Sequence, residues 1–498
     1  MTNEIPPRFP GLMRTYLERL GQRQVLWIPV GVLAFFLKLP LVLLPAAGRD
    51  EAVYAYWANH PEWAYAPLLH QWVKLNTWLG LPDLLALRLP AILPGLLLLW
   101  LTERILARQN RDPIRRLALL LAVALSPWQI YAGSILHPDN LMLFLMVAAV
   151  LGACQKNLYR TAFFAALAFW AKPAGILALA GLGGWLIGQP GPRSQKGLAL
   201  TFALLMVLPV ILAFSPEMIA AIAEFGKMPA ARPWWSNLGL FLASLGLLAG
   251  PALLALAPRL KRAEIPIQLR EQSLAWWLAL AYLGGFLLAA ATRGQIKGNW
   301  LLPGLLMLIL ATPHSRPLMR RWPLWTSLSL LFSLLLVIGM SNPALPRYFE
   351  RTFPEWAQSY GAQAGQREAR VSATASWSAR VGEYQSAAPF FRAVLQAWRE
   401  RHGSENFPPW VLGDDYGLTA QMLRAWGAEQ VRMIIPEDGV FWRESAGFAP
   451  GSGNHGLLLG VRMREDELWP EAGEIIFMLE LPHPQTGDPV RIGVGKGR

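Results

Sequence analysis

Carboxylates that could take part in a group transfer lie at the ends of apolar stretches of this sequence. Asp50 and Glu51 directly follow the first long apolar run, and Asp139 opens a later one after His137 and Pro138. A carboxylate can act as a general base towards a hydroxyl group. Two carboxylates at one membrane face can also hold a divalent cation or position an acceptor. This pattern therefore predicts acid–base or metal-assisted chemistry at a membrane surface.

Each of these residues also has a structural interpretation. Asp50 and Asp139 both precede helix-forming runs, where an Asp side chain caps the first free N–H groups. Taken alone, Asp139 is better explained as such a cap, but the two aspartates together favour a shared site. Glu51 points about a quarter-turn away from Asp50 on a helix, and His137 beside a helix start is more often structural.

Cations lie near the same face. Lys172, Arg293, Lys297 and Arg88 could hold the phosphate of a lipid-linked donor. The alternative is that Lys172 snorkels to the surface and that the other cations anchor the chain at the lipid headgroups. Lys38 is expected to be the deepest charge, where it either snorkels or meets a lipid phosphate. Carboxylates beside cations suit a reaction between a lipid-borne phosphate and a hydroxyl acceptor.

Composition shows which elements position these groups. Of the 498 residues 54% are hydrophobic and 15% are charged, against about 25% charged in soluble domains. This excludes an ordinary soluble enzyme, and the lone Cys154 excludes zinc clusters and intramolecular disulfides. A membrane-spanning helix needs about 20 apolar residues. About eleven stretches fit, at 25–47, 86–103, 117–133, 140–154, 158–171, 174–188, 198–214, 236–257, 274–292, 300–313 and 323–340.

The charge distribution predicts the topology. Up to residue 340 there are 29 basic and 13 acidic side chains, whereas 16 basic and 19 acidic ones follow. The basic excess thus belongs to the apolar part, which indicates membrane topology and excludes a nucleic-acid partner. With a cytoplasmic N-terminus behind an uncleaved signal anchor, every inside loop is the more basic one. An odd number of spans then places residues 341–498 outside, in the periplasm.

Two domains are expected. Residues 1–340 form a polytopic all-α transmembrane domain with additional interfacial helices, and residues 341–498 form a small α/β domain. Residues 50–60 have helical spacing, with Tyr54 and Trp57 on one face, which predicts a helix lying in the membrane interface.

Several short motifs carry a family resemblance. They are Asp50-Glu51-Ala-Val-Tyr54, Tyr65-Ala-Pro-Leu68, Arg88-Leu-Pro90, Pro138-Asp139, Lys172, Asn299-Trp300 with Pro303, and Gly413 to Gly417. In order and spacing they resemble the GT-C superfamily of membrane glycosyltransferases. Within it they are similar to the bacterial branch of the protein O-mannosyltransferase family, close to the lipid A aminoarabinose transferases.

The resemblance implies a polyprenyl-phosphate sugar donor, an extracytoplasmic site, inverting transfer, Asp50 as the base and Asp139 as a second acid. Many relatives carry His or Lys where this chain has Ala66, and His70 is the candidate replacement. A divalent metal (Mg, Mn or Zn) on Asp50 and Asp139 is therefore left open.

We expect an inner-membrane glycosyltransferase that passes a sugar from a polyprenyl-phosphate lipid to a periplasmic glycolipid, lipopolysaccharide or protein. The expected site lining is Tyr54, His70, His137, Asn299 and Trp300. The alternative functions are a lipid or polysaccharide transporter (flippase) and a non-catalytic membrane anchor. A transporter would show charges at mid-membrane depth and related halves, and apart from Lys38 the sequence shows neither.

Overall fold

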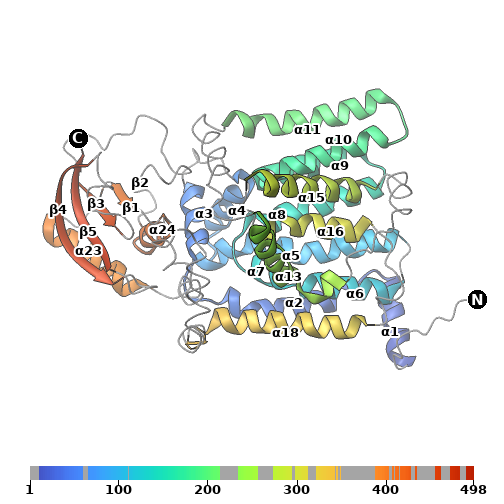
Figure 1. Cartoon of the computed structure of the whole chain (residues 1–498), viewed down its shortest axis with the longest axis horizontal. Helices are drawn as coiled ribbons and strands as arrows, with labels where there is room; N and C mark the ends of the chain where they lie inside the picture. Colours follow the sequence, from blue (N-terminus) through green and yellow to red (C-terminus); the bar gives the residue numbers. More distant parts are fainter. Residues whose placement is uncertain are drawn as a thin grey trace, which may run out of the picture.

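A computed structural model describes most of the chain. The described residues are 11–59, 66–109, 112–213, 234–255, 273–293, 298–311, 321–342, 344–345, 348, 387–402, 407–408, 410–413, 416–427, 432–434, 455–460, 472–482 and 489–497. Two parts are visible in Figure 1, a bundle of elongated helices and a smaller part that contains the sheet.

The bundle consists of helices, most of which lie roughly along one direction (Figure 1), although the first two are bent by 98° against each other. The helices are α1 (Gly11–Gln22), α2 (Trp27–Val42), α3 (Arg49–Asn59), α4 (Pro67–Trp78), α5 (Asp83–Arg108), α6 (Pro113–Ala124), α7 (Pro127–Ala132), α8 (Pro138–Cys154), α9 (Leu158–Ala171), α10 (Ile176–Gly188), α11 (Arg193–Ala213), α13 (Trp234–Ala255), α15 (Leu274–Arg293), α16 (Leu302–Ala311) and α18 (Trp322–Ser341). Two short 3-10 helices, η1 (Pro173–Gly175) and η2 (Gly298–Leu301), precede α10 and α16.

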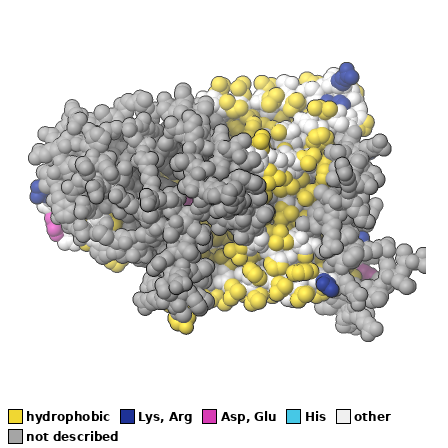
Figure 2. Space-filling model, in the orientation of Figure 1, with side chains coloured by type: hydrophobic (Ala, Val, Ile, Leu, Met, Phe, Trp, Pro, Cys, Tyr) yellow, Lys and Arg dark blue, Asp and Glu magenta, His cyan; other side chains and the backbone are white. Residues whose placement is uncertain are grey.

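Three described helices are long and apolar enough to cross a membrane. They are α5, residues 193–212 of α11, and α18. A fourth candidate is the pair formed by α1 and α2, whose axes differ by 98°. The other apolar helical stretches whose side chains are described, such as α8, α9 and residues 274–288 of α15, have 10–17 residues, so the expected eleven spans stay a prediction. Figure 2 shows hydrophobic side chains covering much of the described surface of the bundle.

Helix α8 lies at the centre of the bundle and packs against α5 and α9. Almost every residue from Pro138 to Gly152 is buried. On α9 the alanines Ala162, Ala165 and Ala166 have no exposed surface. Small residues let two helices approach closely, which is how helices associate where lipid offers no hydrophobic driving force. This packing fixes where the first turn of α8 lies relative to the end of α9.

The tail contains a five-stranded sheet in the order β2-β1-β3-β5-β4. The strands are β1 (Trp410–Gly413), β2 (Arg432–Ile434), β3 (His455–Gly460), β4 (Ala472–Pro482) and β5 (Pro489–Gly497). β1 is parallel to β2 and β3, and β5 is antiparallel to β3 and β4. Helices α23 (Ala388–His402) and α24 (Tyr416–Ala425) accompany the sheet. The boundary expected at residue 341 stays a prediction.

Helix α24 of the tail packs against α3 of the bundle. Tyr56 and Trp57 are 2% and 6% exposed and share one apolar cluster with tail residues such as Met422. Gln421 Nε2 also donates a hydrogen bond of 2.8 Å to the carbonyl oxygen of Ala47. The expectation that the Trp57 side of this helix lies in the membrane interface is therefore wrong, because side chains of the tail cover Trp57.

Candidate active site

Asp139 and Lys172 form a buried ion pair at the end of the bundle nearest to α3. Asp139 lies in the first turn of α8, which begins at Pro138. Lys172 ends α9 in an extended conformation just before η1. The Lys172 ammonium contacts Asp139 Oδ1, and the two residues are 8% and 2% exposed. A carboxylate and a cation that the sequence only places near one face are therefore in direct contact.

Two other predicted residues complete this cluster. Asn299 of η2 donates a hydrogen bond of 2.9 Å from its Nδ2 to Asp139 Oδ2. His137 Nδ1 lies 3.4 Å from the same Oδ2 and accepts a hydrogen bond of 3.3 Å from the backbone N–H of Asp139. Both oxygens of Asp139 are thus engaged, and residues from three distant parts of the sequence meet at one carboxylate.

The turn that presents Lys172 depends on a glycine. The N–H of Gly175 donates to the carbonyl oxygen of Lys172 at 2.8 Å. A Cβ atom at position 175 would collide with the backbone carbonyl of Ala168. Tyr282 of α15 donates a hydrogen bond of 2.9 Å from its hydroxyl to the carbonyl oxygen of Ala174. The sequence analysis did not single out Tyr282, although a tyrosine hydroxyl in the middle of the apolar run 274–292 was the available signal.

Glu51 and Arg88 form a second buried ion pair, with Arg88 Nη2 at 3.0 Å from Glu51 Oε2 and both side chains fully buried. The guanidinium makes five hydrogen bonds, two to Glu51 and one each to the carbonyl oxygens of Val42, Leu44 and Ala46. Five is the complete donor set of an arginine. Arg88 therefore has no N–H group left for a phosphate, which corrects the expected role in donor binding.

The carboxylate of Glu51 is equally saturated. Besides Arg88, it accepts hydrogen bonds from the backbone N–H groups of Gly48 and Leu136, both at 3.0 Å. With two donors on each of its two oxygens, this buried carboxylate leaves no lone pair directed at a substrate. The expected catalytic role of Glu51 is therefore wrong. Glu51 has a structural role instead, because its hydrogen bonds connect the start of α3 to the segment that leads into α8.

Asp50 differs from its neighbour because its side chain is exposed. It lies in the first turn of α3. This turn is attached to the segment before α8 by the hydrogen bond from the Leu136 N–H to Glu51, and Leu136 precedes Asp139 by three residues. No contact between Asp50 and Asp139 is seen among the described residues. The structure thus places an exposed and a buried aspartate on neighbouring segments, and their expected roles stay predictions.

The other expected site residues are dispersed. The His70 ring of α4 is buried and its centroid lies 5.7 Å from that of Trp57, while the centroids of Tyr54 and Trp57 are 5.5 Å apart. The Trp300 ring lies 5.4 Å from Phe286. The side chain of Arg293 and the whole of Lys297 lie outside the part of the chain that is described.

Lys38 is buried more deeply than expected. It is 1% exposed and its ammonium has no hydrogen-bond partner among the described residues. Its ammonium lies against Gly133. The side-chain nitrogens of Lys38, Gln129 and Asn140 all lie close to the Cα of Gly95, where a Cβ atom would contact them. Both interpretations of Lys38, snorkelling and contact with a lipid phosphate, require exposure and are therefore wrong.

The cluster at Asp139 fits a divalent metal poorly. Among the described residues no group of three or more His, Cys, Asp or Glu side chains gathers at one point. Asp139 itself is neutralised by the Lys172 ammonium, which would repel a second cation.

Comparison with known proteins bears on the helical part. Residues 45–188 match the family model described as "Alpha-(1->6)-mannopyranosyltransferase, N-terminal domain". This segment is similar to glycosyltransferases. The expected resemblance to membrane glycosyltransferases is thereby confirmed over the segment that contains Asp50, Glu51, Arg88, Asp139 and Lys172.

The solved structures that match the chain include ArnT from Cupriavidus metallidurans. The apo form has a TM-score of 0.48, and the form bound to undecaprenyl phosphate has 0.49; both are 14% identical and cover 94% of this chain and 97% of ArnT. The arabinofuranosyltransferase AftD from Mycobacteria has a TM-score of 0.43 at 14% identity, over 95% of this chain and 40% of AftD. No curated protein sequence matches the chain. Structural similarity at this level does not define function.

Proposed function

We propose that the protein is a membrane glycosyltransferase that moves a sugar from a polyprenyl-phosphate lipid to a hydroxyl group of an acceptor at the outer membrane face. The observation that carries the proposal is the buried Asp139–Lys172 pair, which lies beside the segment that positions the exposed Asp50. The family match over residues 45–188 supports the same class of reaction.

In the proposed reaction, Asp50 accepts the proton of the acceptor hydroxyl as the oxygen attacks the anomeric carbon. The bond between that carbon and the phosphate oxygen breaks, and the lipid phosphate leaves with the electron pair. Attack from the opposite side inverts the configuration. In this proposal the Lys172 ammonium stabilises the charge that develops on the leaving phosphate. Asp139, with Asn299, orients the Lys172 ammonium.

The test is transfer by the purified full-length protein in lipid nanodiscs. A panel of polyprenyl-phosphate sugars is supplied with a crude envelope extract, and mass spectrometry follows the released polyprenyl phosphate. Loss of a general base slows such reactions by about 10²–10⁴-fold, and we expect that loss for Asp50→Asn. The matched control is Asp83→Asn, because Asp83 is also exposed and its Oδ2 pairs with Arg424 at 3.1 Å.

Release that survives Asp50→Asn would overturn the assignment of the base to Asp50 and leave the class of reaction in place. No release with any donor would overturn the enzyme proposal, and lipid flipping would then be the next activity to assay.

A further inference from the structure

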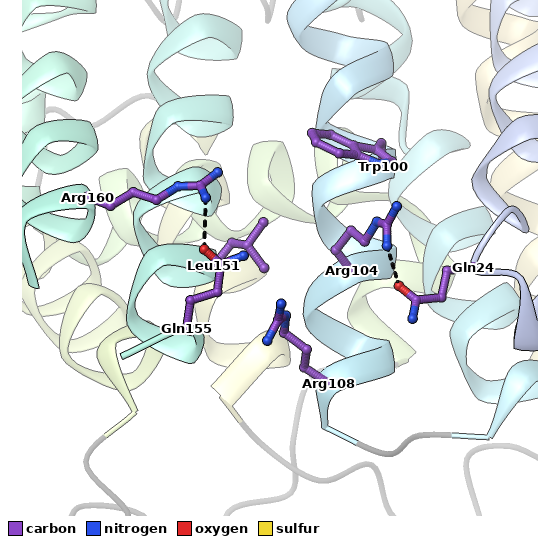
Figure 3. Close-up of a pocket in the computed structure, with 7 residues that line it drawn as sticks. All are labelled: Gln24, Trp100, Arg104, Arg108, Leu151, Gln155 and Arg160. Carbon is purple, nitrogen blue, oxygen red and sulfur yellow. Dashed lines mark hydrogen bonds between the residues drawn. The ribbon is translucent and has the colours of Figure 1, made fainter. Parts of the chain in front are cut away.

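An arginine-lined pocket lies at the end of the bundle opposite to Asp139. Its volume is about 490 Å³, and its lining comes from α5, α8, α9 and the turn before α2 (Figure 3). The lining residues are Gln24, Trp100, Arg104, Arg108, Leu151, Gln155 and Arg160. Gln155 follows α8, whose first turn carries Asp139, so a rise of about 1.5 Å per residue separates the two by about 24 Å. The pocket is therefore distinct from the candidate active site.

None of the three arginines of the pocket forms an ion pair with a described residue, and the nearby carboxylate of Glu103, which acts electrostatically on Arg104, is fully buried and does not line the pocket. None of the seven lining residues is acidic. Arg104 and Arg160 donate instead to neutral amide oxygens, Gln24 Oε1 at 2.8 Å and Gln155 Oε1 at 2.9 Å. Arg108 makes no hydrogen bond or ion pair with a described residue, and in Figure 3 its guanidinium extends into the space between the other two. Three like charges around one cavity favour an anionic occupant.

The side chains that line the pocket also change from polar to apolar along helices α5 and α8. Trp100, Arg104 and Arg108 are spaced four residues apart and therefore lie on one face of α5. Leu151 and Gln155 have the same spacing along α8 and its end. Trp100 is thus one turn further into the bundle than Arg104, and Leu151 is one turn further than Gln155. A pocket with a cationic mouth and an apolar inner wall suits an amphiphile.

We infer that this pocket binds the phosphate group of an anionic membrane phospholipid. Arginine contacts phosphate oxygens through paired N–H groups, and basic pockets between membrane helices bind anionic headgroups. Free inorganic phosphate would use only the arginines. A phospholipid also contacts Trp100 and Leu151 with its glycerol and first methylene groups, so the apolar wall favours the lipid.

The test is native mass spectrometry of the full-length protein with an equimolar mixture of phosphatidylglycerol and phosphatidylcholine that carry identical acyl chains. We expect the complex with one bound phosphatidylglycerol to be about tenfold or more as abundant as the complex with one bound phosphatidylcholine. This ratio corresponds to a preference of about 1.4 kcal/mol. Arg104→Gln/Arg108→Gln/Arg160→Gln should abolish this preference. Arg108→Gln alone should reduce it severalfold, and it breaks no hydrogen bond with a described residue, so it keeps the test valid if the triple variant misfolds.

The matched control is Arg19→Gln/Arg193→Gln/Arg321→Gln. It removes the same charge from exposed side chains on α1, on α11 and before α18, none of which lines the pocket. The control should keep the tenfold preference. An equal loss in both triple variants would overturn the inference, because diffuse charge would then explain the binding. Complete displacement of the lipid by millimolar inorganic phosphate would also overturn it, by making the site one for a free anion.

Discussion

At the scale of residues, two of the buried ion pairs among the described residues differ in how completely they are satisfied. The Glu51–Arg88 pair is closed, since the carboxylate has four donors, the guanidinium has five acceptors and both side chains are 0% exposed. In the Asp139–Lys172 pair the lysine side chain keeps 11% of its surface exposed. A cation that is held by a carboxylate but still accessible is better suited to meet a ligand phosphate.

The closed pair should affect stability and not catalysis. Glu51→Gln leaves the Arg88 guanidinium buried without its counter-charge, which costs about 3–5 kcal/mol. We expect a large fall in the melting temperature, while the transfer rate per folded molecule stays within about twofold of wild type. Thermal unfolding followed by tryptophan fluorescence, together with the polyprenyl phosphate assay, checks both. An activity loss as deep as that of Asp50→Asn without loss of stability would contradict this assignment.

The open pair should affect both stability and catalysis. Lys172→Met leaves Asp139 without its cation and should lower stability by about 3–5 kcal/mol. In Asp139→Leu/Lys172→Met both charges are gone, so stability should return towards wild type, whereas transfer should stay at least about 10²-fold reduced. The same two measurements are made on both variants. Recovery of transfer in the double variant would mean that the pair only maintains the fold.

At the scale of elements, the sharp turn from α9 through η1 into α10 places Lys172. The turn is narrow because Gly175 packs directly on the backbone of Ala168. The far side of the turn is held by Tyr282 through the carbonyl oxygen of Ala174. The position of the Lys172 ammonium thus depends on three helices, α9, α10 and α15.

Widening this turn should reduce transfer more than stability. Gly175→Ala forces α10 away from Ala168 and should shift Lys172, and a misplacement of about 1 Å is enough for a loss of about 10²-fold. Overpacking costs about 1–3 kcal/mol. The control is Gly183→Ala, on α10 as well, where a Cβ would meet no atom within 4 Å. The transfer rate and the melting temperature are measured for both variants. Equal transfer rates in the two would contradict the proposed role of the turn.

At the scale of the whole molecule, the candidate site and the arginine pocket occupy opposite ends of the helical bundle. The tail covers α3 at the end that carries Asp139, with Arg424 Nη2 at 3.1 Å from Asp83 Oδ2 and Gln421 bonded to Ala47. The basic excess of the apolar part therefore gathers away from the tail. By the positive-inside rule, the tail end should face the periplasm.

Thiol labelling tests this orientation because the chain has a single cysteine. In a Cys154→Ser background, Gln396→Cys marks an exposed position on α23, and Ser194→Cys marks an exposed position at the opposite end, on α11. A membrane-impermeant maleimide added to spheroplasts should label the protein with Gln396→Cys at once. The protein with Ser194→Cys should react only after permeabilisation. The reverse pattern would contradict the predicted topology and move the candidate site to the cytoplasmic face.

The sequence alone determined the apolar character of the helical part, the asymmetry of charge between its two ends, and the position of carboxylates at segment ends. Hydropathy and charge act on each segment separately, so a local pattern carries this information. It also supported the glycosyltransferase resemblance, because short motifs such as Pro138-Asp139 keep their order along the chain.

Only the tertiary structure decided which charge meets which. Glu51, and not Asp50, pairs with Arg88, and Asp139 meets Lys172 and Asn299 from 33 and 160 residues away. These contacts depend on how helices rotate and pack against one another, which no local pattern specifies. The covering of Trp57 by the tail is of the same kind, since an aromatic face looks alike in sequence whether lipid or protein lies against it.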